Sequence, residues 1–240
     1  MKKVVKVLIA LLILIAAAAG VVVYYYGDNI SALISGMNSS SEDLAVKMNE
    51  NREKLKTQVE KYTSVQVADM SAEDEEKLLS GEISLEDVAE KYNLPVDYMR
   101  DDDVTGISYK STAPVAVSKN DNTNEIDAVV GESVSRMYAL KAKYVNKLGE
   151  LERAVFKEYS SLPKEKQNDD AKYKIVLNNL NYVSELEKKC DDEVSNVLAS
   201  LQTELEKLEG DTEIIGILQK AYQDEKEVKK AYYMSLYNKN

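Results

Sequence analysis

The side chains that most often carry enzyme chemistry are scarce in this chain of 240 residues. It has no histidine, which excludes histidine-based acid–base catalysis and the usual zinc sites. Cys190 is the only cysteine, so neither an internal disulfide nor a cysteine metal cluster can form. Because Cys190 falls on a heptad stripe, we expect a buried thiol rather than a nucleophile or a disulfide between two chains.

Acidic residues outnumber basic ones by 42 to 31, which gives a formal net charge of −11. Nucleic acid binding needs a basic surface, so we expect no nucleic acid partner. Asp101, Asp103, Thr105 and Gly106 have the opening spacing of a calcium loop, but Thr112 occupies the position where that loop needs a glutamate. We therefore expect a solvated acidic loop there, without a metal.

The pair Glu132-Ser133 resembles the Glu-Ser pair of lytic transglycosylases, whose glutamate acts as the catalytic acid. The resemblance covers these two residues, and the glycine-rich continuation of those enzymes is absent. The pair also lies within a continuous helical stripe. We expect no catalytic, cofactor-binding or metal-binding residues in this chain, and no enzyme activity.

The segment 81–99, GEISLEDVAEKYNLPVDYM, has the spacing of a compact helix–turn–helix. Ala89 would lie where the two helices cross, and Asn93 at the turn position that favours a positive φ. The segment resembles the DNA-binding motif, which the acidic surroundings exclude. It is also similar to the middle of a LysM domain, a module that binds peptidoglycan or chitin, although the preceding Glu73–Leu79 is predicted helical rather than extended. Both a hairpin that packs its own core and a glycan-binding hairpin fit this pattern.

The segment 7–26 contains 20 residues without a charge, VLIALLILIAAAAGVVVYYY. As a helix rising ~1.5 Å per residue it would be ~30 Å long, the thickness of a hydrocarbon core. Lys2, Lys3 and Lys6 precede it, so the positive-inside rule keeps the N-terminus in the cytoplasm and sends the remainder outside. A cleaved signal peptide is the alternative, but the apolar run is long enough to span. We expect a single-pass signal anchor in a bacterial cytoplasmic membrane.

The remainder of the chain divides into three regions. Residues 28–66 are predicted to be a polar connector and an amphipathic helix, and residues 67–123 an acidic helical hairpin with an irregular segment. Short strands at 107–109 and 115–117 are compatible with that segment. Residues 124–240 carry three amphipathic stripes separated by short connectors, which predicts an antiparallel bundle of three helices.

The three helices of this bundle are expected at 125–161, 169–209 and 213–237, with Gly210 as the stop and Thr212 as the following N-cap. Heptad spacing in the middle helix indicates coiled-coil-like packing. At ~60 Å it would be longer than its neighbours, so the first amphipathic helix, a second copy or a partner must cover part of it.

These observations predict an all-α fold. After residues 1–27, which hold the transmembrane anchor, comes an elongated antiparallel helical bundle with a small, mainly helical insert. The predicted function is a non-enzymatic envelope protein whose extracytoplasmic part is a scaffold or protein-interaction module. The predicted partners are the membrane, through residues 7–26, and another protein or a second copy, through the bundle. The alternative function is binding to cell-wall peptidoglycan through residues 81–99.

Overall fold

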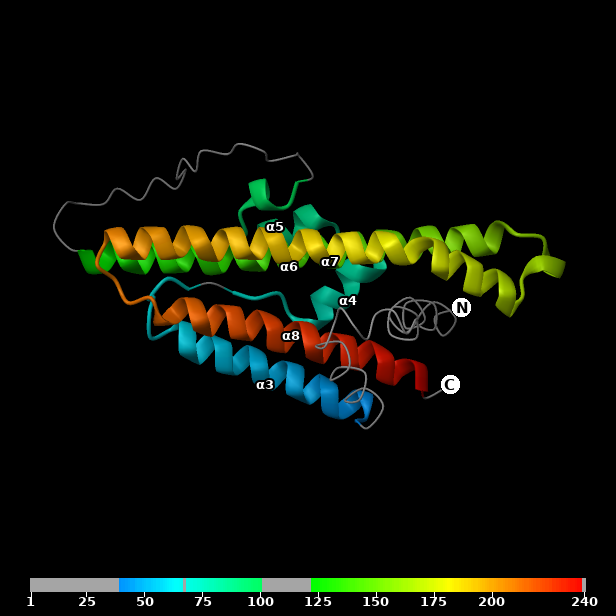
Figure 1. Ribbon diagram of the computed structural model, residues 1–240, viewed down its shortest axis with the longest axis horizontal. Helices are drawn as coiled ribbons and strands as arrows, with labels where there is room; N and C mark the ends of the chain where they lie inside the picture. Colours follow the sequence, from blue (N-terminus) through cyan, green and yellow to red (C-terminus); the bar gives the residue numbers. More distant parts are fainter. Residues whose placement is uncertain (1–38, 67, 101–121, 239–240) are drawn as a thin grey trace.

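A computed structural model describes residues 39–66, 68–100 and 122–238 (Figure 1). Helices and turns make up these residues, and they contain no strand, which confirms the predicted all-α class. The elements are α3 (Ser41–Val59), α4 (Ala72–Ser80), α5 (Leu85–Tyr92), the short 3-10 helix η2 (Val96–Tyr98), α6 (Asn122–Ser161), the short 3-10 helix η3 (Lys164–Lys166), α7 (Asp169–Lys207) and α8 (Glu213–Asn238).

Within the described ranges, no helix is both long enough and apolar enough to cross a membrane. The predicted anchor at 7–26 lies outside the described residues, as do the suggested calcium-like loop and the strands at 107–109 and 115–117.

Two antiparallel helix pairs form the body of the molecule, as Figure 1 shows. Helices α6 and α7 make a long hairpin, and α8 runs beside α3 along one side of it. The main core contains Val59 of α3, Val134 of α6, Leu201 of α7 and Leu218 of α8, so all four helices share it. The helical bundle is therefore confirmed, but α3 joins the three expected helices, and α8 packs more extensively on α3 than on α7.

Local sequence explains where several helices begin and end. Ser40 and Asp43 form a capping box at the start of α3, and Ser84 with Asp87 forms another at the start of α5. Asn168 caps α7 by accepting a hydrogen bond from the amide of Ala171 at 3.0 Å. These side chains satisfy amides that have no partner inside their own helix, so each cap fixes the entry point of the chain.

The turn between α7 and α8 differs from the expectation in two details. The residue with positive φ is Glu209, at 55°, and not Gly210. The amide of Gly210 instead donates to the carbonyl of Leu205 at 2.8 Å, which closes the last turn of α7. The side chain that accepts from the amide of Glu213 belongs to Asp211, at 2.8 Å, rather than to Thr212.

Small residues on α6 let α4 and the segment that connects α3 to α4 approach α6 closely. A Cβ at Gly131 would lie 2.6 Å from the Cβ of Val65, and a Cβ at Gly149 would lie 2.2 Å from the carbonyl oxygen of Leu79. Eighteen residues separate the two glycines, which is five turns of an α-helix. The glycines therefore lie on one face of α6, and the insert packs along that face.

Candidate functional site: a buried ion network and a projecting hairpin

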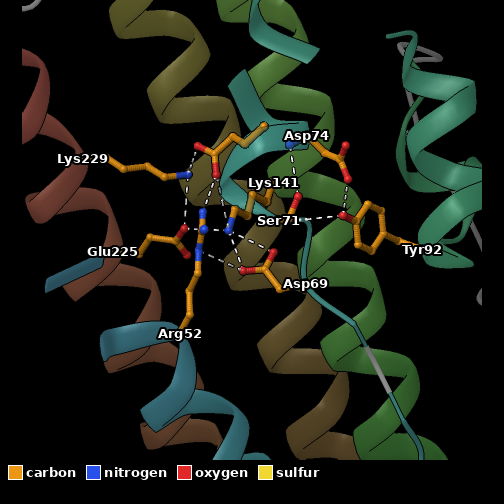
Figure 2. A network of polar contacts seen from close by, with 9 residues as sticks. Arg52, Asp69, Ser71, Asp74, Tyr92, Lys141, Glu225 and Lys229 are labelled. Atoms are coloured by element: carbon orange, nitrogen blue, oxygen red, sulfur yellow. Dashed lines mark hydrogen bonds and ion pairs between the residues drawn. The ribbon is translucent and has the colours of Figure 1, made fainter. Parts of the chain in front are cut away.

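A network of six charged side chains lies where α3, α4, α6 and α8 meet (Figure 2). Arg52 comes from α3, Asp69 from the segment before α4, and Glu75 from α4, and the other members are Lys141 of α6 with Glu225 and Lys229 of α8. All six side chains are largely buried, with exposed fractions between 10% and 24%.

Lys141 is the centre of this network. Its Nζ lies 2.7 Å from the carboxylate of Asp69 and 2.7 Å from that of Glu225. The Glu75 carboxylate forms ion pairs with the Arg52 guanidinium at 2.5 Å and with the Lys229 ammonium at 2.7 Å. Three positive and three negative groups are thus held together, and the network as a whole is neutral.

The pKa values of the network acids show how tightly the charges are coupled. Burial alone would raise the pKa of Glu75 and of Glu225, but the ammonium groups of Lys229 and Lys141 outweigh it, and both pKa values are lowered. The pKa of the Tyr138 phenol is raised, mainly because the side chain is buried and to a smaller extent because of the negative charges of Asp69 and Glu225. Glu75 and Glu225 therefore stay ionised and paired, and the network connects α3, α4, α6 and α8.

A second polar cluster joins α4 to α5. Asp74 accepts a hydrogen bond from the hydroxyl of Tyr92 and pairs with the ammonium of Lys91 at 2.6 Å. The backbone amide of Ser71 donates to the Tyr92 hydroxyl at 3.0 Å, and the Ser71 side chain caps α4. Hydrogen bonds from Lys91 and Tyr92 lower the pKa of the Asp74 carboxyl to about 2.

The Asp74 cluster should make stability depend on acid in a defined window. The folded pKa of about 2 is below the ordinary value of 3.8, so ionised Asp74 stabilises the fold above about pH 4, and this contribution is lost as the pH falls towards 2. The difference in melting temperature between the native chain and Asp74→Asn should be constant from pH 6 to about 4 and then shrink. A difference that does not change down to about pH 2 would contradict this assignment.

A third cluster joins α7 to α8. The Glu187 carboxylate lies 2.8 Å from the ammonium of Lys226 and 2.6 Å from that of Lys230. Asp191 also receives Lys226 at 2.8 Å and accepts a hydrogen bond from the hydroxyl of Tyr222 at 2.5 Å. Glu187 interrupts the heptad pattern in the sequence, and these contacts explain why a charge is accommodated there.

Cys190 is half-buried beside this third cluster and packs against the main core. The hydroxyl of Tyr222 lies 3.5 Å from its Sγ. Burial raises the pKa of the thiol to about 11.

We therefore predict that Cys190 labels slowly in the native chain. A thiol with a pKa of about 11 is about a hundredfold less ionised at pH 8 than one with an ordinary pKa, and the thiolate is the reactive form. Native protein should react with iodoacetamide about a hundredfold more slowly than protein unfolded in urea, and Cys190→Ala should cost about 1 kcal/mol. Equal rates, or a dimer on a non-reducing gel, would show that the thiol is accessible.

Glu132 and Ser133 lie within α6, as expected. The Glu132 side chain forms an ion pair, whereas the Ser133 side chain is buried. Glu132 pairs with Arg136 one turn further along the same helix, at 2.5 Å. Ser133 is buried, with 2% of its surface exposed. Glu132 is thus an ion-pair partner within α6, and Ser133 is packed inside the bundle.

The segment 81–99 forms α5 and a turn with Asn93 at a positive φ of 50°, as expected, but the expected second helix is only the three-residue 3-10 helix η2. The apolar side chains Val88, Ala89 and Leu94 of this segment are buried in a core shared with Ala139 of α6 and its neighbours. The preceding segment forms α4, where a LysM module has its first strand. The residues that carry the resemblance to LysM therefore pack the hairpin onto α6.

The end of the α6/α7 hairpin extends beyond the C-terminal end of α8, as Figure 1 shows. We call residues 151–186 the tip. Its small core consists of Leu151, Val155 and Ile175, and partly buried side chains from the same two helices and their connection surround it. Three side chains of α7 in the tip, Tyr173, Leu177 and Tyr182, are 52%, 38% and 44% exposed. Tyr173 is exposed although it shares the heptad phase of the buried Val194 and Leu201.

A shallow groove of about 270 Å³ lies between α3 and α8. Leu55, Gly216 and Ile217 line it together with the charged side chains of Lys54 and Lys220. Its volume is below the roughly 300–1,000 Å³ of typical ligand pockets. We therefore place the candidate functional surface on the tip and not in this groove.

No protein-family model, curated protein or solved structure matches this chain.

Proposed function

We propose that the chain is a non-enzymatic, single-pass envelope protein whose helical bundle lies outside the cytoplasm and acts as a scaffold or protein-interaction module. The observation that carries this proposal is the tip, a two-helix projection that exposes Tyr173 and Leu177 beyond the four-helix body. Large apolar side chains that gather on a projecting surface are typical of contact sites.

The polar clusters support a non-enzymatic role. The acids of the six-residue network are each ion-paired with lysine or arginine. For Glu75 and Glu225 this pairing lowers the pKa, away from the range of a general acid or base. The Glu187 and Asp191 carboxylates are paired in the same way. These groups connect helices, and the rigid body they form is suited to presenting the tip.

The tether is the predicted anchor at 7–26, with the body outside the membrane and the N-terminus inside. A reporter enzyme that is active only outside the cytoplasm, fused after Asn240, should be active and should stay in the membrane pellet after alkaline washing. Activity from a cytoplasmic reporter at the same position would contradict the orientation. Release of the active fusion into the medium would show that the segment is a cleaved signal peptide.

A further inference from the structure

We infer that the tip is a self-association surface, on which the α7 helix of a second copy of this chain packs antiparallel against α7. This inference rests on the proposed function and names the partner for the same surface. It is carried by the face of α7 on which Tyr173 and Leu177 lie.

In the body of the molecule α8 packs on one face of α7, and the exposed face of the tip is the continuation of that same face. Tyr173 and Leu177 precede Glu187 and Asp191 by two heptads, so the two pairs lie on one face of a supercoiled helix. In the body this face meets α8, because Glu187 and Asp191 both pair with Lys226. Helix α8 continues past Lys230, the partner of Glu187, to Asn238, so it runs beside α7 to about residue 179 and ends before Leu177 and Tyr173 (Figure 1). Among the described residues no other helix replaces it there.

The geometry of that interface specifies the kind of occupant. Helix α8 runs antiparallel to α7. A helix that takes the place of α8 along the tip would therefore also run antiparallel to α7. A two-fold axis perpendicular to α7 brings in exactly such a helix, the α7 of a second copy, and two-fold symmetry is the commonest arrangement of soluble oligomers. Two tips would then form four antiparallel helical segments, because each copy contributes about 27 Å of α7 (169–186) and about 16 Å of α6 (151–161).

Charge favours the tip over the rest of the molecule for this contact. Residues 151–186 contain six acidic and six basic residues, whereas the whole chain has a net charge of −11. Two copies that met along their full length would bring like charges together, but two neutral tips do not. A common membrane anchor would also keep copies in one plane and raise their local concentration.

The test uses the full chain in a mild detergent and measures its mass by sedimentation equilibrium over a range of concentrations. The native chain should reach twice the monomer mass, and Tyr173→Lys with Leu177→Lys should raise the dissociation constant at least about tenfold. The matched control is Val46→Lys, at a side chain of α3 that is 56% exposed and outside the tip. At concentrations where both chains are monomeric, the tip variant should keep the native melting temperature, because both residues are exposed.

Three results would overturn self-association through the tip. A native chain that stays monomeric at all concentrations excludes the dimer. A dimer that the tip variant forms as well as the native chain, or that Val46→Lys weakens equally, places the contact elsewhere. A monomer whose tip is bound by another protein in cells would reject the second copy as partner while leaving the proposed function intact.

Discussion

Replacement of Lys141 by methionine should destabilise the fold by about 3–5 kcal/mol. The substitution leaves Asp69 and Glu225 without their 2.7 Å ion pairs and gives a buried, previously neutral network an excess negative charge. Removing one partner of a buried pair is costly because the other charge stays out of water. Urea unfolding of the full chain in mild detergent, followed by circular dichroism, measures the loss.

The matched control for Lys141 is Lys220→Met. Lys220 also forms an ion pair at 2.7 Å, with Asp224, but 68% of its side chain is exposed. We expect a change of at most about 1 kcal/mol there. Adding Glu225→Gln to Lys141→Met should recover part of the loss, because it restores neutrality. Similar losses at Lys141 and Lys220 would show that the network contributes no more than a surface pair.

Replacement of Gly149 by alanine should destabilise the fold by about 1–3 kcal/mol. Its new Cβ would lie 2.2 Å from the carbonyl oxygen of Leu79, a backbone atom that moves only if the end of α4 moves with it. Arg153 holds the same carbonyl with a hydrogen bond of 2.9 Å, so displacement of α4 would also break that contact. The variant should unfold at a lower urea concentration than the native chain.

Gly216→Ala is the control for this prediction, because Gly216 also lies inside a helix, but a Cβ there meets nothing within 4 Å. Alanine is a better helix former than glycine, so this variant should gain up to about 1 kcal/mol. The opposite signs at the two glycines isolate the contact with Leu79. A stabilising effect at both positions would mean that α4 does not pack as closely on α6 as described.

The helices could be predicted from sequence because their apolar spacing and their caps agree. The stripes at 125–161, 169–209 and 213–237 correspond closely to α6, α7 and α8. The spacing of Ser84 and Asp87 is that of a capping box, and α5 begins directly after Ser84. Local signals of this kind depend on neighbours in the chain, and they need no knowledge of which helices meet.

The partner of each helix could not be predicted in the same way. The sequence indicated three antiparallel helices, but nothing in the short connectors shows that α8 packs most extensively on α3, which precedes it by more than 150 residues. The sequence does indicate that another element packs closely on α6, because one face of this helix carries several small residues. These are Gly131, Ala139, Ala142 and Gly149. Such a face predicts a close neighbour without identifying it.

The ion networks were also missed by sequence reasoning. Lys141 and Glu225 are ordinary members of a chain with 73 charged residues, and their pairing depends on the packing of α6 against α8 and α4. Glu187 was visible as an interruption of the heptad pattern, and the structure assigns it to Lys226 and Lys230. A charged residue at a heptad core position therefore indicates an ion pair, because a charge there requires a partner across the helix interface.

The most direct test of the central claim, that the projecting tip is the contact surface, is a photo-cross-linking comparison in living cells. A photoreactive amino acid replaces Tyr173 or Leu177 in the tip, and Val46 or Val96 in the body, which are exposed to a similar degree. We predict protein adducts from the two tip positions and few from the body positions, with an adduct of twice the chain mass if the partner is a second copy. Adducts from the body positions alone, or from all four positions equally, would contradict the claim.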